Sequence, residues 1–155
     1  MNYLLDTNLI IIYTKDSKIA AEIEHRYNLF SAENKLSVSV VTIGELNAII
    51  KKLKLGERRQ KLIQDLLENM VKVDIHFEEV IDSYGDIDAY SQGKLNEHPT
   101  EFSARNMGKN DLWIAATASA FDLTLITTDK DFNHLKDKFI KLEYVDIQEI
   151  RAMIK

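Results

Sequence analysis

Residues 1–13 read MNYLLDTNLIIIY, and this stretch decides how the chain begins to fold. Residues 2–6 form a short, mostly apolar run, which predicts a buried strand with apolar side chains on both faces. The pattern changes after Asp6, and the apolar residues at 9–12 predict a helix that begins at Thr7. A carboxylate therefore lies between two segments that both belong in a core, and its position needs a physical reason.

Strands and helices alternate along the rest of the chain. Apolar and β-branched runs predict strands at residues 35–42, 71–75, 123–128 and 144–147. Helical spacing of apolar residues predicts helices at residues 18–34, 43–56, 57–70, 77–95 and 110–121 and after the last strand, with Gly56 as a helix stop. A polar segment around Pro99 predicts a loop near 96–108. This order favours an α/β fold, one domain over residues 1–155 with a central, mostly parallel sheet of four or five short strands flanked by helices.

Composition excludes several classes of protein. The chain has 155 residues, of which 45% are hydrophobic and 29% charged, the balance of a soluble globular protein. It contains no cysteine, so neither a disulfide framework nor a cysteine-based zinc site can form. No signal-peptide pattern opens the chain, and no apolar run approaches the roughly 20 residues of a membrane helix. We therefore expect a cytoplasmic protein with no membrane partner.

The formal net charge of −5 argues against a simple nucleic-acid-binding module, because such proteins are usually basic. A nucleic acid would have to be held by a local basic patch or by a bound metal ion. The segment KKLKLGERRQK at 51–61 is basic, and the favoured interpretation is that its charges lie on solvent-exposed helix faces. The alternative is a patch that binds the phosphates of a nucleic acid. Trp113 is read as a core residue in preference to a base-stacking platform.

Acidic residues come where the predicted strands end. Asp6 follows the first strand, Glu45 lies about one helical turn after the second, Asp111 opens the alanine-rich helix, and Asp129 follows the strand at 123–128, with Asp131 two residues later. In parallel α/β sheets, ligands bind outside the carboxyl ends of the strands. We therefore expect these carboxylates to share one edge of the sheet.

Each carboxylate taken alone has an ordinary structural explanation. Asp6 can cap a helix, and residues 42–45 match the S/T-x-x-E capping box. Asp111 can complement a helix dipole, while Asp129 can belong to a turn and Asp131 can cap a short helix. These explanations stay open for every single residue.

The joint pattern is harder to explain by capping alone. Carboxylates that gather beside apolar walls repel one another, and that repulsion is weakly screened. A cation would neutralise them. A ligand set made only of oxygen, with no cysteine or histidine, favours Mg²⁺, with Mn²⁺ as a substitute. The sequence thus predicts a divalent metal site at the rim of the sheet.

With these residues in place, the chain resembles the PIN-domain ribonucleases, and most of all the VapC-type toxins of type II toxin–antitoxin systems. Four stretches carry the resemblance, in the family's order and over nearly the whole chain: LLDTN at 4–8, SVVTIGEL at 39–46, NDLWIAATA at 110–118 and LITTDKDF at 125–132. The resemblance implies a single PIN-like domain.

The resemblance also implies roles for residues. The acidic catalytic quartet comprises Asp6, Glu45, Asp111 and Asp129, with Asp131 as the alternative to Asp129. Asp6, Asp111 and Asp129 are the implied metal ligands for one or two ions, and Glu45 positions or deprotonates the attacking water. The small polar residues beside the first acid match Thr7 and Asn8, and a bracing hydroxyl matches Thr127 or Thr128.

The implied activity is that of a Mg²⁺-dependent endoribonuclease with an RNA substrate, for which transfer RNA is the family-level expectation. The implied partners are a cognate antitoxin and a second copy of the chain in a homodimer. One departure is the segment at 77–109, which is longer than in compact toxins and leaves its role open.

Two other classes compete with this interpretation. One is a non-catalytic interaction module on a PIN scaffold, in which the acids only cap helices. The other is a phosphotransfer domain of the receiver or haloacid dehalogenase kind. The dehalogenase pattern needs an aspartate at the place of Asn8, and a receiver needs an acidic pair where Thr7 follows Asp6.

Overall fold

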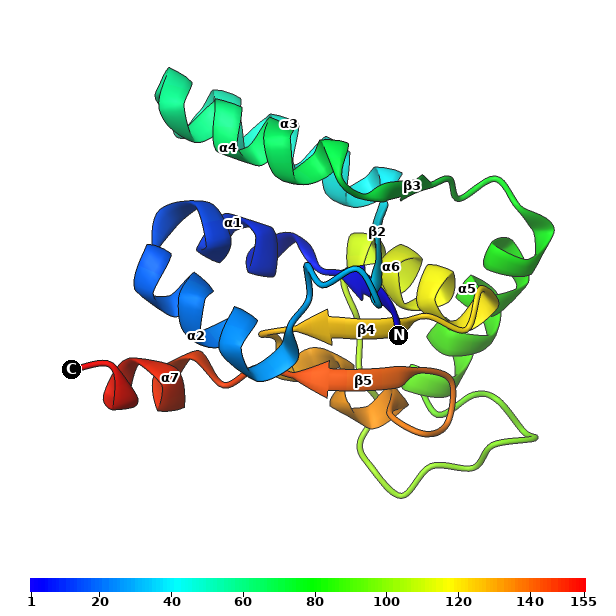
Figure 1. Ribbon diagram of the computed structural model, residues 1–155. Coiled ribbons are helices and arrows are strands. Elements are labelled where there is room, and N and C mark those ends of the chain that lie inside the picture. The colour runs from blue at the N-terminus through cyan, green and yellow to red at the C-terminus, as the bar shows by residue number, and fades with distance from the viewer.

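The computed structural model describes residues 1–155, built around one five-stranded sheet in the order β3-β2-β1-β4-β5. The strands are β1 (Asn2–Leu5), β2 (Lys35–Ser39), β3 (Val71–Val73), β4 (Thr124–Thr127) and β5 (Lys141–Tyr144). Every neighbouring pair is parallel. The predicted α/β class is confirmed, and all five carboxyl ends lie at one edge of the sheet (Figure 1).

Helices cover both faces of the sheet. They are α1 (Thr7–Lys15), α2 (Ser17–Tyr27), α3 (Val40–Lys52), α4 (Glu57–Glu68), α5 (Glu78–Ser91), α6 (Lys109–Ala120), the 3₁₀ helix η1 (Lys130–Leu135) and α7 (Ile147–Met153). One core contains side chains of α1, α2, α3, α4 and α7, and the other contains side chains of α5, α6 and η1. In Figure 1, α3 and α4 extend beyond the sheet at the top of the view. None of the helices combines the length and apolar character needed to cross a membrane.

Strand β1 lies at the centre of the sheet and contributes to both cores. Tyr3 and Leu5 belong to one hydrophobic cluster and Leu4 to the other, as the alternation of side chains along a strand requires. Leu4 and Leu5 are almost completely buried. The first five residues thus fix the central strand, and they deliver Asp6 to its carboxyl end.

The helix predicted at 18–34 is wrong in its length. Helix α2 ends at Tyr27, because Asn28 adopts a left-handed conformation with φ of 48° and its N–H closes on the carbonyl of Glu24. Phe30, which falls within the predicted helix, lies outside α2. Its ring is 40% exposed and packs edge-on against Tyr13, with ring centroids 5.7 Å apart.

The boundary between strand β2 and helix α3 also differs from the prediction. The strand ends at Ser39 and not at residue 42, because the Ser39 side chain caps α3 by accepting a hydrogen bond from the Val41 N–H at 3.1 Å. Gly56 does not stop this helix. The chain turns through Lys54, with φ of 50°, and Gly56 instead precedes the first residue of α4.

The last strand was predicted three residues too late. Strand β5 covers Lys141–Tyr144, and the prediction placed it at 144–147. Asp146 ends the extended segment by capping α7, since its carboxylate accepts hydrogen bonds from the N–H groups of Gln148 and Glu149, each at 3.0 Å.

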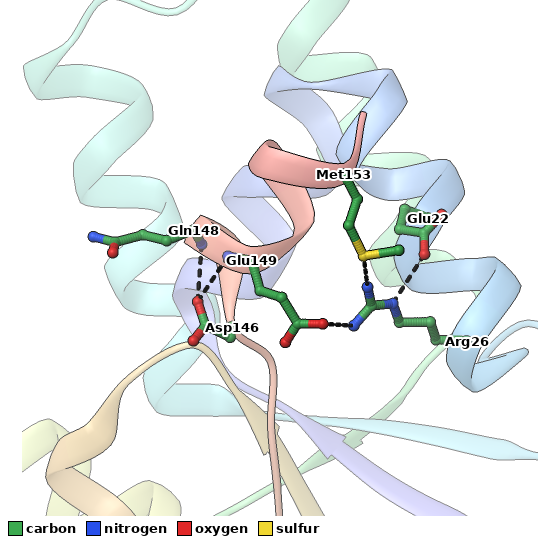
Figure 2. Close-up of polar contacts among 6 residues, drawn as sticks. All are labelled: Glu22, Arg26, Asp146, Gln148, Glu149 and Met153. Carbon is green, nitrogen blue, oxygen red and sulfur yellow. Dashed lines mark hydrogen bonds and ion pairs between the residues drawn. The ribbon is translucent and has the colours of Figure 1, made fainter. Parts of the chain in front are cut away.

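Helix α7 is attached to α2 by one arginine (Figure 2). Arg26 donates from Nε to Glu22 on its own helix at 2.9 Å and from Nη1 to Glu149 on α7 at 3.2 Å. Its Nη2 lies 2.8 Å from the sulfur of Met153. This contact joins residues more than a hundred positions apart in the sequence, although it is exposed to solvent.

The long middle segment consists of α5 and an irregular loop at 92–108, which leaves the body of the molecule at the lower right of Figure 1. The second half of the loop is anchored to the end of α5. Arg105 N–H donates to the Ser91 carbonyl at 2.6 Å, and Phe102 packs edge-on against Tyr90 with centroids 5.5 Å apart. The loop returns the chain to Gly108, directly before α6 and its acid Asp111.

Candidate functional site

Asp6 is a buried carboxylate at the end of the central strand. Its side chain is 4% exposed. Oδ1 accepts a hydrogen bond from the Thr7 N–H at 2.8 Å, and Oδ2 accepts one from the Thr127 hydroxyl at 2.7 Å. Asp6 therefore does cap α1, as the ordinary explanation holds. Burial nevertheless raises its pKa, against the lowering effect of both hydrogen bonds, and the charges of Glu45 and Asp129 raise it further.

Glu45 reaches the same place from helix α3. The Thr7 hydroxyl donates to Glu45 Oε1 at 2.7 Å, so one threonine links the first acid to the second. The capping-box explanation for Glu45 is wrong, because Ser39 is the cap of α3 and Glu45 is already the sixth residue of the helix. Because Glu45 caps no backbone N–H group at the helix end, the position of its half-buried carboxylate beside Asp6 needs another explanation.

Asp111 has the largest electrostatic perturbation of the group. Burial is the first cause that raises its pKa to about 7, followed by the charges of Asp6, Asp129, Glu45 and Asp131. A carboxylate that only complements the dipole of α6 would have a lowered pKa, since the positive helix end favours the ionised form. The direction of the shift therefore reports burial first, and then the like charges of the neighbouring acids.

The structure distinguishes Asp129 from Asp131. Asp129 follows β4 and caps η1 by accepting from the Asp131 N–H at 2.8 Å, while its own N–H donates to the Thr127 hydroxyl at 3.0 Å. Asp131 is exposed and is not the cap. The bracing hydroxyl is that of the fully buried Thr127. Asn8 is exposed, and its side chain takes no part in this network.

The four predicted acids thus converge from different elements, at the ends of β1 and β4, in α3 and at the start of α6. No group of three or more acidic or histidine side chains is already spaced as a set of direct metal ligands. The donor chemistry fits a hard divalent cation, because every donor is an oxygen and Mg²⁺ usually retains several water ligands. Water molecules between carboxylate and ion would account for the wider spacing.

One residue of this network was missed in the sequence. Thr42 is fully buried, and its hydroxyl lies 3.1 Å from that of Thr7. The S/T-x-x-E pattern at 42–45 instead predicts a helix cap at this residue. The signal that it belongs beside Glu45 is its position three residues earlier, which puts both side chains on one face of a helix.

Replacement of Thr127 by valine is expected to lower stability by about 1–3 kcal/mol, because the buried Asp6 carboxylate and the Asp129 N–H each lose a partner. The cost should grow with pH, since the hydroxyl stabilises only the ionised form of Asp6. Urea unfolding at several pH values measures both effects. Thr127→Ser retains the hydroxyl and is the control; a pH-independent difference between the two variants would contradict the assignment.

A comparison with protein-family models matches residues 3–138 to the PIN domain. The chain belongs to the PIN-domain family. The match covers all the converging acids, from Asp6 to Asp129 and Asp131. No curated protein matches this PIN domain closely enough by sequence to be counted.

Solved structures similar to this PIN domain come from bacterial toxin–antitoxin complexes. VapBC2 from Rickettsia felis, solved with a DNA fragment from its promoter, has a TM-score of 0.71 and 23% identity, covering 94% of this chain and 100% of that one. VapBC-1 from nontypeable Haemophilus influenzae has a TM-score of 0.65 and 29% identity, covering 93% and 98%. FitAcB from Neisseria gonorrhoeae has a TM-score of 0.60 and 22% identity, covering 92% and 96%. The whole PIN domain is therefore close in fold and length to these chains.

The basic cluster predicted at 51–61 is mostly solvent-exposed in this PIN domain. Lys61 forms an ion pair with Asp65 on its own helix at 2.9 Å, and Arg59 turns toward the carbonyl of Ile11 at 3.4 Å. The simpler interpretation as exposed helix faces therefore accounts for Lys61, whereas Arg59 is half-buried and its Nε is buried without a hydrogen-bond partner. A phosphate-binding role for the remaining lysines stays a prediction.

Proposed function

We propose that this PIN domain is a metal-dependent endoribonuclease, the toxin of a toxin–antitoxin pair. The observation that carries the proposal is a chain of hydrogen bonds through two buried threonines. Thr127 joins Asp6 to the residue Asp129, and Thr7 joins Asp6 to Glu45. Capping explains Asp6 and Asp129 separately, but it gives no reason for Glu45 and Asp111 to share their surroundings.

Asp6, Asp111 and Asp129 would hold one or two Mg²⁺ ions, partly through water. A bound divalent ion lowers the pKa of a coordinated water and stabilises the negative charge that develops on the phosphate. The hydrogen bonds from Thr7 and Thr127 fix the Asp6 carboxylate, so it does not have to be ordered when RNA binds.

Glu45 is the proposed general base. The Thr7 hydroxyl donates a hydrogen bond to Oε1 of Glu45, which orients the carboxylate and leaves Oε2 able to accept a proton. Glu45 accepts the proton of the attacking water, the new P–O bond forms, the bond to the 3′ oxygen breaks, and that oxygen takes up a proton from solvent water. Because water is the nucleophile, the products carry a 5′-phosphate and a 3′-hydroxyl, and the RNA 2′-hydroxyl takes no part.

The proposed antitoxin fits a groove between α3 and α4. A cavity of about 520 Å³ there is lined by apolar side chains of both helices, among them Leu46, Ile63 and Leu67. An apolar peptide segment could cover this groove, and a basic side chain of the same peptide could neutralise the acids and exclude the metal. The similar VapBC and FitAcB structures are toxin–antitoxin complexes, which supports this partner. Transfer RNA as the substrate and a homodimer of this chain are further parts of the proposal.

Incubation of the purified, antitoxin-free chain with a panel of transfer RNAs and hairpin RNAs tests the activity. Cleavage is expected with Mg²⁺ or Mn²⁺, with complete loss in excess EDTA and recovery when Mg²⁺ is restored. Sequencing of the ends should find 5′-phosphates. Cleavage that persists in EDTA, or 2′,3′-cyclic phosphate ends, would contradict the mechanism, and a lack of cleavage of every RNA would favour a non-catalytic interaction module.

A further inference from the structure

A second cleft opens directly beside the acidic cluster. It lies between α3 and α6, has a volume of about 510 Å³ and shares Glu45 with the candidate catalytic site. Its wall is largely apolar, formed by residues such as Val41, Ile49 and Ile75. This size lies within the range of small-molecule sites. The proposed reaction, on which this inference rests, uses the acids but leaves this cleft without a role.

Trp113 gives the cleft an aromatic wall. The prediction that this residue is core is only partly right, because the side chain is half-buried and lines the cleft. Tyr84 on α5 packs against it, with ring centroids 4.2 Å apart and an angle of 40° between the rings. That contact holds the indole in place, so an incoming planar group would meet a wall that is already ordered.

Three polar groups around the cleft have no partner within the chain. The residues Trp113, Asn110 and Lys52 line the cleft, where Asn110 and Lys52 are exposed to solvent, and none of the three side chains forms an intramolecular hydrogen bond or ion pair. Lys52 follows Glu45 by seven residues, which places it on the same face of α3 and about 10 Å farther along the helix axis. The cleft therefore offers donors and one positive charge at a short distance from the acids.

We propose that this cleft binds an unpaired nucleobase next to the cleaved phosphate of the RNA. Stacking on an aromatic side chain is the common way in which proteins hold single-stranded bases, and it tolerates different bases. The Asn110 amide can hydrogen-bond to the edge of the base, and Lys52 can contact a neighbouring phosphate. A base in a duplex cannot enter, so the cleft selects single-stranded segments such as loops.

The fluorescence of Trp113 tests occupancy directly, because it is the only tryptophan in the chain. The full chain carrying Asp6→Asn, which keeps the RNA intact, is titrated in Mg²⁺ with a single-stranded RNA oligonucleotide. We expect saturable quenching by the single strand and none by the same sequence in a duplex. An abasic residue placed at each position in turn should abolish the quenching at one position. RNA binding detected by anisotropy without any change in fluorescence would overturn the proposal.

Two variants test the energetic contribution of the cleft. Trp113→Leu retains an apolar side chain against Tyr84 and is expected to weaken binding of the single strand about ten-fold. Lys52→Ala is expected to weaken it several-fold and to reduce its salt dependence. Lys138→Ala is the matched control, since Lys138 is an exposed lysine that lies outside both the cleft and the basic segment at 51–61. In the active chain, both cleft variants should raise KM far more than they lower kcat.

The outcomes separate this inference from the proposed nuclease activity. If the chain cleaves RNA and both cleft variants retain the wild-type KM, the base-binding cleft is wrong and the nuclease stands. If RNA quenches Trp113 but no RNA is cleaved, the cleft stands and the nuclease is wrong. Quenching by peptides and not by RNA would assign the cleft to a protein partner and overturn the proposal. Should Trp113→Leu fail to fold, Lys52→Ala and the abasic series decide the question.

Discussion

Replacement of Asp6 by asparagine is expected to lower the rate of RNA cleavage by about 10³-fold. Asparagine has the same shape as aspartate, so its side chain can still fill the buried space between Thr7 and Thr127. What the variant loses is a negative charge at the centre of the acidic cluster. The initial rate of cleavage at saturating Mg²⁺ measures the loss, and thermal unfolding shows whether the fold is retained.

The chain offers a matched control for this experiment in Asp16, which caps α2. The carboxylate of Asp16 accepts from the N–H groups of Lys18 and Ile19, each at 3.1 Å, without any neighbouring acid in its network. Asp16→Asn therefore makes the same chemical change at a residue that only caps a helix. It should cost a fraction of 1 kcal/mol or so in stability and leave cleavage unchanged. Equal activity of the Asp6 and Asp16 variants would show that Asp6 is a cap and no more.

Replacement of Asp111 by asparagine is expected to abolish cleavage and, at the same time, to stabilise the metal-free protein by about 2 kcal/mol at pH 8. The pKa of Asp111 is raised from 3.8 to about 7 by burial and by the surrounding acids. A shift of that size corresponds to about 4 kcal/mol against the ionised form, and partial exposure of the side chain reduces the effect by about half. Asparagine removes this cost because it carries no charge.

The pH dependence of this gain has a definite sign. The folded protein binds the Asp111 proton more tightly than the unfolded chain, so the group's stabilising contribution is fully present below about pH 4 and is lost as pH rises through about 7. The gain from Asp111→Asn should therefore be small at pH 4 and complete at pH 8. Urea unfolding in EDTA at both pH values measures it. A loss of stability at pH 8 would instead indicate that Asp111 acts mainly on the dipole of α6.

The fold could be predicted from the sequence because its strands are short apolar runs, which differ clearly from the helical spacing of apolar residues in the segments between them. The ends of the elements were less predictable, since they depend on single hydrogen bonds. Ser39 and Asn28 end their segments through a side-chain cap and a left-handed backbone, and neither is visible as a change in hydrophobic pattern. The hydrophobic pattern of the segment at 18–34 stays amphipathic beyond Tyr27, where the helix in the structure ends.

The acidic residues of the candidate site could be predicted because a parallel sheet places the ends of its strands at one edge. Their connections could not. Thr7 joins Asp6 to Glu45, and Thr127 joins Asp6 to Asp129, through contacts between residues up to 121 positions apart. The cleft at Trp113 was also beyond prediction, because the sequence does not say which side of an alanine-rich helix faces an opening.

Calorimetric titration of the metal-free protein with Mg²⁺ at pH 7 tests most directly whether these separate acids share a cation. We expect saturable binding with release of protons, since Asp111 is partly protonated at this pH and loses its proton to the metal. Asp6→Asn and Asp111→Asn should each weaken the affinity at least about ten-fold, and Asp16→Asn should not. An absence of saturable binding, or equal affinity in all four proteins, would contradict the account.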